Sequence, residues 1–307
     1  MSRRKGEAIS GWLNVDKPQG PTSSAVVGRL RRAFGAAKAG HGGTLDPLAT
    51  GVLPIAFGEA TKVMGFVVDT DKRYRFTVRW GEARTTDDAA GEVLESSPRR
   101  PIEAEIRAAL PRFTGPIEQI PPRFSALKIG GRRAYALARA GAAVDLAPRQ
   151  VAVRALDFAG SLDPDHAVFE VACGKGTYVR SLARDLARAL GTVGHVAALR
   201  RLAVGPFRAE AAIPLDLLIE LGHSPAAFER LLPILTPLAD IPAVAVTGAE
   251  AELIRSGQAV PVVGHGRPDL LNPLRDGDVV RVTTGELPVA MARLDNGQLR
   301  PVRVFNL

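Results

Sequence analysis

A proline-rich segment near residue 235 limits how these 307 residues can fold. Leu231 to Pro242 reads LLPILTPLADIP, with three prolines in twelve residues. Because proline lacks the backbone donor and fixes φ, neither a long helix nor a central strand can run through it. We therefore expect two domains, over residues 1–240 and 241–307. The chain length, at about 150 residues per domain, favours the same division.

The second unit carries the signals of short strands. Three valine-rich runs, Ala259 to Val263, Asp278 to Thr283 and Val302 to Phe305, are separated by glycine, proline and Asp-Gly turns. This pattern is typical of a small all-β unit. The unit holds 7 basic and 7 acidic residues, so the formal charge of +8 comes from the first unit.

The first unit mixes elements without a regular alternation. Trp12 to Val15 is a predicted strand, and Thr22 to Phe34 is a predicted helix with a capping hydroxyl at its start. Tyr74 to Trp80 alternates between apolar and polar side chains, as half-buried strands do. Thr177 to Leu190 has a helical apolar period that ends at a glycine. The irregular order favours an α+β fold over a parallel doubly wound sheet.

Positive charge is concentrated in two segments. Residues 1–40 hold 8 basic and 2 acidic residues, and residues 123–150 hold 6 basic residues and one acid. A polyanion would contact chiefly these segments. A charge of +8 over this length is also compatible with arginines that merely keep the protein soluble.

Several classes of protein are excluded by composition. The longest stretch without a charged residue, Pro47 to Gly58, is too short and too rich in proline and glycine to span a membrane. The one cysteine, Cys173, permits no internal disulfide, and the five histidines show no metal-ligand spacing. We expect a soluble, cytoplasmic protein that uses no cofactor and no metal.

The densest candidate for chemistry is Gly40 to Gly58, GHGGTLDPLATGVLPIAFG. Pro47 restricts Asp46 to extended backbone, and the surrounding glycines allow a ligand to approach closely. A carboxylate held on such a loop is a plausible nucleophile or base. Asp-Pro is also a common turn dipeptide, and from these residues alone a simple turn is the stronger interpretation.

The longer string HGGTLDPLATGVLPIAFGEATK resembles the catalytic loop of the TruB family, the bacterial tRNA pseudouridine-55 synthases. The residues after 240 resemble a PUA domain, the small β-barrel at the C-terminus of that family. Four further segments match family motifs in the right order: NVDKPQGPTS (14–23), KRYRF (72–76), GTYVRSLARDL (176–186) and VAALRR (196–201).

The resemblance implies a catalytic domain of the pseudouridine synthase type, with a mixed, largely antiparallel sheet, followed by a PUA-like RNA-binding domain. It implies that one uridine in the T loop of tRNA, at position 55, becomes pseudouridine. The bond from N1 to C1′ breaks and a bond from C5 to C1′ forms, without redox chemistry. The T stem-loop is then the partner, and we expect a monomer with no obligate protein partner.

The resemblance also assigns three residues to the reaction. Asp46 maps onto the essential catalytic aspartate. Arg180 maps onto the arginine that pairs with it, since a nearby guanidinium favours the ionised carboxylate. Tyr74 maps onto the tyrosine that packs against the uracil, where a ring and a hydroxyl are both useful. The pattern alone also allows simple core packing for Tyr74. For Arg180 it allows a place in the surface row with Arg184 and Arg188, although a position one turn into the helix favours an inward direction.

Further residues are carried over as substrate contacts. Tyr178 and Leu199 map onto residues that line the uridine pocket. His41 maps onto the histidine beside the flipped nucleotide, whose ring would fill the place that the extruded base leaves. Gly42 stands where the family often has threonine, and we expect a looser loop there.

The basic residues 123–150 resemble the RNA-gripping insertion of the family, called the thumb. Lys128, Arg132 and Arg133 are expected to contact phosphates, as is Lys17 in the first motif; such contacts position RNA without reading its sequence. Arg184 and Arg188 are expected to be solvated members of a surface row on the predicted helix.

Two other functions remain open at this point. An RNA-binding or RNA-folding factor could use the same fold without catalysis, although intact Asp46, Tyr74 and Arg180 argue against it. The RNA-guided branch of the superfamily works inside a multiprotein particle and would be inactive as an isolated chain. The short C-terminal unit and the basic insertion favour the stand-alone form.

Overall fold

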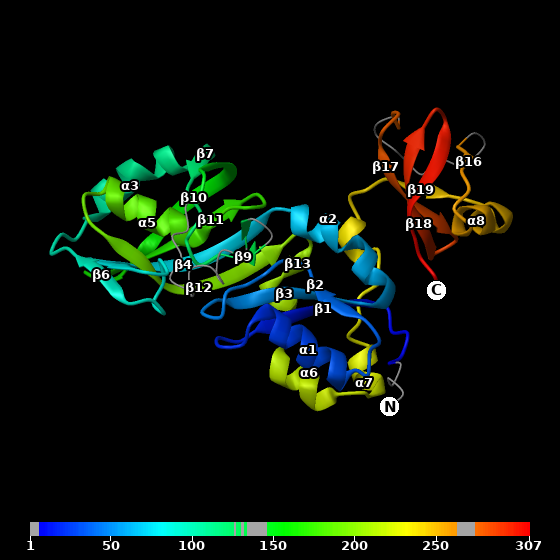
Figure 1. Cartoon of the computed structure of the whole chain (residues 1–307), viewed down its shortest axis with the longest axis horizontal. Coiled ribbons are helices and arrows are strands. Elements are labelled where there is room, and N and C mark those ends of the chain that lie inside the picture. The colour runs from blue at the N-terminus through cyan, green and yellow to red at the C-terminus, as the bar shows by residue number, and fades with distance from the viewer. Residues whose placement is uncertain (1–5, 126, 130–131, 134–145, 263–273) are drawn as a thin grey trace.

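A single large sheet runs through the first unit of the computed structural model, which describes residues 6–125, 127–129, 132–133, 146–262 and 274–307 (Figure 1). In spatial order its main path is β14 (Ile213–Pro214), β1 (Gly11–Lys17), β3 (Thr50–Phe57), β12 (Gly194–Val204), β4 (Lys72–Trp80), β11 (His166–Cys173), β10 (Arg149–Asp163) and β7 (Gly115–Gln119). Two short strands add to it, β2 (Ala39–His41) beside β3 and β13 (Phe207–Arg208) beside β12. Only β1–β14 and β3–β12 pair in parallel among these described strands. The predicted α+β class with a mixed, largely antiparallel sheet is confirmed.

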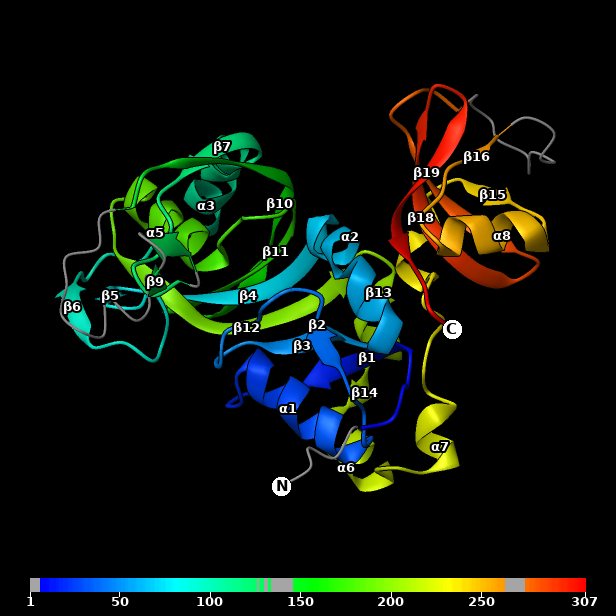
Figure 2. The same cartoon turned by 45° about the vertical axis from the view of Figure 1, so that its right-hand side comes forward.

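Helices cover the two ends of this sheet. Figures 1 and 2 show α3 and α5 beside β10 and β11, and α1 and α6 beside β1. The α-helices are α1 (Ser23–Ala33), α2 (Met64–Asp69), α3 (Glu103–Ala109), α5 (Val179–Ala189), α6 (Leu215–Leu221), α7 (Pro225–Phe228) and α8 (Gly248–Arg255). Short 3-10 turns are η1 (Gly58–Val63), η2 (Leu110–Phe113), η3 (Ala209–Ala211) and η4 (Thr236–Leu238). Outside the two sheets, β5 (Glu82–Arg84) pairs with β6 (Val93–Ser96), and β8 (Lys128–Ile129) pairs with β9 (Arg132–Arg133).

The predicted helix and strands of the first unit are confirmed. The Thr22 hydroxyl caps α1 by accepting a hydrogen bond from the Ala25 amide at 3.1 Å. Gly35 follows that helix with φ +63°, a conformation that glycine adopts without steric cost. In β4, Phe76, Val78 and Trp80 are buried, as the alternation predicts, and the Phe76 ring stacks on Phe169 of β11.

The predicted helix over 177–190 begins two residues late. Tyr178 has extended backbone, with φ −102° and ψ 112°, and α5 starts at Val179. The Gln119 side chain accepts a hydrogen bond from the Tyr178 amide at 3.1 Å and donates one to its carbonyl at 3.4 Å. A tertiary contact therefore sets this helix start, which local periodicity cannot show.

The second unit is a curled five-stranded sheet, in the order β15 (Ala243–Ala245), β17 (Val279–Thr284), β18 (Leu287–Asp295), β19 (Gln298–Val304) and β16 (Val260–Pro261) (Figure 2). Within the described residues, β15 and β16 are its open edges, so the sheet is a half-barrel. The expectation of an all-β unit is wrong in one respect, because the unit contains α8. Thr247 and Glu250 form a capping box at the start of that helix, a signal that was present in the sequence.

The proline-rich segment is packed rather than loose. Ile234 and Leu238 are buried in a cluster with Trp12 of β1 and with Met291 and Phe305 of the second unit. The Trp12 indole donates a hydrogen bond to the Ile234 carbonyl at 3.0 Å. This segment thus joins the two sheets through a shared apolar cluster.

Candidate active site

The Asp46 loop connects β2 to β3 and is held from several sides. The Ser23 hydroxyl of α1 accepts a hydrogen bond from the Leu45 amide at 2.8 Å and donates one to the Leu45 carbonyl at 3.0 Å. Two residues later, the Pro47 carbonyl accepts a hydrogen bond from the Gly20 amide at 2.8 Å. Asp46 itself stands between these anchored neighbours, so its backbone is fixed while its side chain stays 37% exposed.

The expectation of a looser loop at Gly42 is wrong. Gly42 is buried, and its amide donates a hydrogen bond to the Pro54 carbonyl at 2.8 Å. A Cβ at this position would lie 2.7 Å from the Val67 side chain. The glycine therefore permits close packing of the loop on α2.

Arg180 approaches Asp46 from the first turn of α5. Its Nη2 lies 2.9 Å from Asp46 Oδ2, and its side chain is only 5% exposed. The same guanidinium donates hydrogen bonds to the carbonyls of Thr86 and Phe124, each at 2.9 Å. Charge-assisted hydrogen bonds of this kind are roughly twice as strong as neutral ones, so Arg180 is oriented before any ligand arrives.

A second carboxylate, Asp88, shares Arg180. Its Oδ2 lies 3.7 Å from Arg180 Nη1, and it is almost fully buried. The Thr86 hydroxyl and the Ala90 amide donate hydrogen bonds to Asp88 Oδ1, at 2.5 and 3.0 Å. Sequence reasoning missed Asp88, because TTDD in a loop matches no motif and only the fold brings it to Arg180.

These side chains open onto a cavity of about 240 Å³. Five of the residues predicted from the sequence meet there: Asp46, Tyr74, Tyr178, Arg180 and Leu199. The other lining residues are Thr44, Leu45, Ser125, Thr177 and Val179. The cavity therefore combines one ionised pair with aromatic and aliphatic walls, which is the composition of a site for a planar, polar ligand.

Burial keeps both tyrosine hydroxyls protonated. It raises the pKa of Tyr74, and the nearby Arg201 guanidinium acts in the opposite direction. Burial also raises the pKa of Tyr178, against the nearby charge of the Arg180 guanidinium. Both hydroxyls can therefore donate hydrogen bonds to a ligand near neutral pH.

Two predicted site residues lie outside the cavity wall. His41 ends β2 and is half-buried, at the start of the Asp46 loop. Lys17 was expected to contact RNA phosphates, and the structure contradicts this, because its side chain is fully buried. The Lys17 ammonium donates hydrogen bonds to the carbonyls of Pro18 at 2.8 Å and Pro47 at 3.5 Å, so it supports the Asp46 loop instead.

Arg184 is not the solvated surface residue that the periodicity predicted. It is only 15% exposed, and its guanidinium lies 2.9 Å from Asp87 Oδ2 and 2.9 Å from Asp185 Oδ1. It also donates a hydrogen bond to the Ile120 carbonyl at 2.9 Å, just before the basic insertion. Arg188, one turn later, is exposed as expected.

The thumb-like insertion is described only in part. Lys128, Arg132 and Arg133 lie on the short strands β8 and β9, and their side chains are outside the described part of the chain. The predicted phosphate contacts of these three residues therefore stay predictions.

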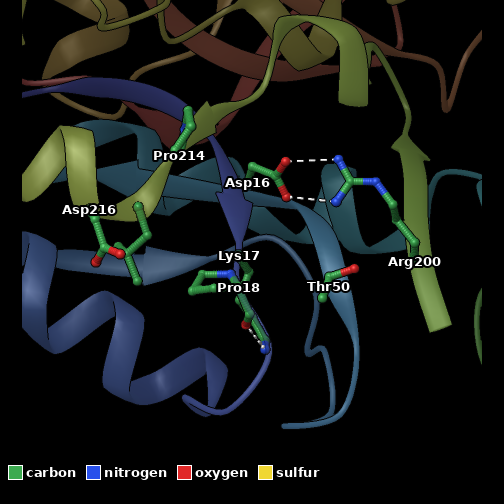
Figure 3. A pocket seen from close by; sticks show the side chains of 8 residues that line it. Asp16, Lys17, Pro18, Thr50, Arg200, Pro214 and Asp216 are labelled. Atoms are coloured by element: carbon green, nitrogen blue, oxygen red, sulfur yellow. Dashed lines mark hydrogen bonds and ion pairs between the residues drawn. The ribbon is translucent and has the colours of Figure 1, made fainter. Parts of the chain in front are cut away.

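A second cavity, of about 290 Å³, lies beside β1 and β12 (Figure 3). It is lined by Asp16, Lys17, Pro18, Thr50, Arg200, Pro214, Leu215 and Asp216. Asp16 and Arg200 form a bidentate ion pair across it, at 3.0 and 2.8 Å. Asp46, Tyr74 and Arg180 do not line this cavity.

The described residues contain neither a metal-binding cluster nor a membrane-spanning helix. No group of three or more His, Cys, Asp or Glu side chains is placed to hold a metal ion in the described ranges. In those same ranges, no helix has the length and apolar character needed to cross a membrane.

Comparison with protein families gives two matches along the chain. Residues 31–179 match the model described as TruB family pseudouridylate synthase (N terminal domain). Residues 180–239 match the tRNA pseudouridylate synthase B C-terminal domain. Asp46 and Tyr74 fall in the first match, and Arg180 and Leu199 in the second.

Curated relatives and solved structures agree with these matches. Proteins named tRNA pseudouridine synthase B from Rhodospirillum rubrum and Caulobacter vibrioides are 54% and 49% identical, each over 99% of both chains. The structure of an H/ACA RNP bound to a substrate RNA containing 2'-deoxyuridine has a TM-score of 0.75 and 25% identity, covering 97% of this chain and 85% of that one. A Cbf5-Nop10-Gar1 complex follows with a TM-score of 0.72 and 27% identity, covering 96% and 84%.

Proposed function

Because the chain belongs to the TruB family of pseudouridylate synthases, we propose that it converts the uridine at position 55 in the T loop of tRNA, with Asp46 as the catalytic carboxylate. The enzyme is an isomerase that makes pseudouridine from uridine in tRNA. The N1–C1′ bond breaks, the uracil turns, and C5 bonds to C1′ while the proton on C5 is released. No atoms are gained or lost apart from exchange of that proton with water.

The observation that carries the proposal is the Asp46–Arg180 pair at the mouth of the cavity. Arg180 is 5% exposed and rigidly bonded, whereas Asp46 is 37% exposed and free to meet a ligand. The guanidinium stabilises the ionised carboxylate, and an ionised carboxylate is needed whether Asp46 attacks the sugar, attacks the base or removes the C2′ proton. The geometry is compatible with all three routes.

The cavity walls suit a uracil ring. Tyr74 and Tyr178 offer aromatic faces and hydroxyl donors, and Leu199 offers an apolar contact from β12. A stacked uridine must leave the T loop to reach Asp46, at a cost of a few kcal/mol. His41, at the start of the same loop, is the residue that we assign to the place left by the base.

We assign residues 1–240 to catalysis and residues 241–307 to a PUA-like RNA-binding unit. The basic segments 1–40 and 123–150, with Lys128, Arg132 and Arg133, then contact tRNA phosphates. Because its substrate is tRNA, we place the enzyme in the cytoplasm, as a monomer that needs neither cofactor nor protein partner.

The alternative of an RNA-guided synthase has less support than a stand-alone synthase. The similar solved structures come from an H/ACA RNP and a Cbf5-Nop10-Gar1 complex, at 25% and 27% identity. The relatives named tRNA pseudouridine synthase B are about twice as similar and align over nearly the whole of both chains. We therefore expect the isolated chain to act on naked tRNA.

Tritium release from C5-labelled uridine in an unmodified tRNA transcript tests the proposal. We expect stoichiometric release by the wild type and none by Asp46→Asn, which should bind tRNA normally. Asp165→Asn is the matched control, because Asp165 also pairs with an arginine, Arg100, away from the cavity. Release outside the T loop, or full release by Asp46→Asn, would contradict the proposal.

Another outcome of this assay would concern whether the chain needs further proteins or RNA to act on tRNA. If the wild type binds tRNA tightly but releases no tritium, the chain is a binder or a catalyst that needs further components. Adding RNA-guided particle proteins would then distinguish these two cases.

A further inference from the structure

Arg201 is a fully buried cation that the mechanism above does not use. It lies on β12, two residues after Leu199, and is only 1% exposed. Burial of a charged group costs free energy unless the group is paired or hydrogen-bonded. The retention of Arg201 in this position therefore calls for a specific task.

The guanidinium joins both arms of the Asp46 loop. Its Nη2 and Nη1 donate hydrogen bonds to the carbonyls of Gly43 at 3.0 Å and Thr44 at 3.2 Å, before the aspartate. Its Nε donates one to the Val52 carbonyl at 2.7 Å, after the aspartate. One planar group thus closes the base of the loop that displays Asp46.

The backbone of Arg201 is in close contact with the same loop. Gly51 has φ +97°, and a Cβ there would lie 2.2 Å from the Arg201 carbonyl oxygen. Gly51 pairs with Arg201 in the parallel β3–β12 register. The loop can therefore return to the sheet only by passing directly over Arg201.

A second neighbour of Arg201 lies on β4 and lines the cavity. Arg201 pairs with Tyr74 across β12 and β4. The positive charge of its guanidinium opposes the effect of burial on the pKa of the Tyr74 hydroxyl. Two residues of the cavity, on separate elements, are thus connected to one buried cation.

We propose that Arg201 is a positioning residue that fixes the Asp46 loop and the Tyr74 hydroxyl relative to each other for the isomerisation. The proposal rests on the function given above for Asp46 and Tyr74. Arg201 touches neither substrate nor cavity, and it acts through the two residues that do.

The geometry requires arginine rather than another cation. A guanidinium carries five donors in a rigid plane, so it can reach carbonyls on both arms of the loop and still face a hydroxyl. Lysine has three donors on one atom and cannot span the same partners. The charge alone is therefore insufficient.

The chain offers a matched control in the neighbouring residue. Arg200 points away from the cavity, and its guanidinium pairs with Asp16 across the second cavity (Figure 3). Arg201→Lys and Arg200→Lys thus make the same change at adjacent positions on opposite faces of β12.

The test compares single-turnover tritium release, tRNA affinity and thermal unfolding for the two variants. We expect Arg201→Lys to bind tRNA normally but to react on the order of 100-fold more slowly, the effect of a small misplacement of reacting groups. Arg200→Lys should react at the wild-type rate. Equal rates for the two variants, or a loss confined to tRNA affinity, would overturn the proposal.

A double-variant cycle with Tyr74→Phe separates positioning from general damage. If Arg201 acts through the Tyr74 hydroxyl, the combined variant loses severalfold less activity than the product of the single losses. Fully multiplicative losses would contradict that link. If Arg201→Lys does not fold, Arg201→Gln replaces it, because it buries no charge; failure of both to fold would assign Arg201 to folding and overturn the proposal.

The outcome is also distinguishable from failure of the proposed function. Full activity of Asp46→Asn would remove the catalytic role of the loop itself. Loss of activity in Asp46→Asn together with full activity in Arg201→Lys would remove only the positioning role.

Discussion

Three buried cations surround the Asp46 loop, and they differ in their partners. Arg180 pairs with the carboxylate itself at 2.9 Å. Arg201 bonds the carbonyls of both loop arms, and Lys17 bonds the Pro47 carbonyl next to the aspartate. A backbone carbonyl stabilises a charge less than a carboxylate does. Burial therefore lowers the pKa of Lys17 to about 8, although the charge of Asp46 acts in the opposite direction.

Lys17 should make the stability of the protein depend on alkaline pH. Between about pH 8 and 10.5, the unfolded chain keeps the Lys17 proton that the folded chain has lost. The unfolded state binds more protons there, so this residue makes the free energy of unfolding rise with pH. Lys17→Met removes that contribution.

Urea unfolding of both proteins at several pH values in this window measures the effect. Other groups titrate in both proteins, so the difference between the two curves isolates Lys17. Parallel curves would show that the buried ammonium keeps its ordinary pKa.

At the scale of elements, the first turn of α5 organises the region around the cavity. Its late start leaves Tyr178 extended against Gln119, and Arg180 then points to Asp46. The Ser181 hydroxyl and the Arg184 guanidinium both donate hydrogen bonds to the Ile120 carbonyl, at 2.8 and 2.9 Å. The first two turns of α5 thus anchor the Asp46–Arg180 pair and the segment that leads into the basic insertion.

Arg184→Ala should destabilise the protein by about 1.5–3 kcal/mol, the range for hydrogen bonds to charged groups. The change leaves Asp87 without the guanidinium 2.9 Å away, in a position where burial already raises the pKa of that carboxyl. Arg188→Ala, on the exposed side of the same helix, should change stability by less than about 0.5 kcal/mol. Denaturant unfolding of both variants checks this, and similar losses would contradict the role of Arg184.

At the scale of the whole molecule, the second unit docks on the segment that supports the Asp46 loop. The Lys62 ammonium of η1 donates a hydrogen bond to the Val304 carbonyl at 2.8 Å, and Glu59 accepts one from the Asn306 amide at 2.6 Å. The following helix, α2, packs against the loop, since Val67 lies directly beside Gly42. The two units therefore meet through η1 and α2.

Phe305 anchors this contact. It is fully buried in the cluster that contains Trp12 and Phe207, so Phe305→Ala should cost about 3–5 kcal/mol through lost burial and a cavity. Leu307→Ala, at a residue that is 65% exposed, is the control and should cost little. Calorimetric unfolding measures both, and an unchanged transition in Phe305→Ala would show that the two units do not support each other.

Features that depend on neighbouring residues could be predicted from the sequence. The cap and apolar period of α1, the alternation of β4 and the turns of the second unit were all readable, because each depends on neighbours within one or two turns. The motif around Asp46, with those around Tyr74 and Arg180, led to the family and to five of the residues that line the cavity. The two-residue period of β12 also predicts that Leu199 and Arg201 share one face of the strand and that Arg200 lies on the other.

The support of the site depends on contacts between distant segments, which no local pattern records. Arg201 bonds a carbonyl 158 residues away, and Arg180 bonds one 94 residues away. Asp88 reaches Arg180 from a loop without a motif. The burial of Lys17 and Arg184, both expected at the surface, follows from the same long-range packing. A local pattern records whether a side chain is charged, and the packing of distant segments decides whether that charge meets solvent or a buried partner.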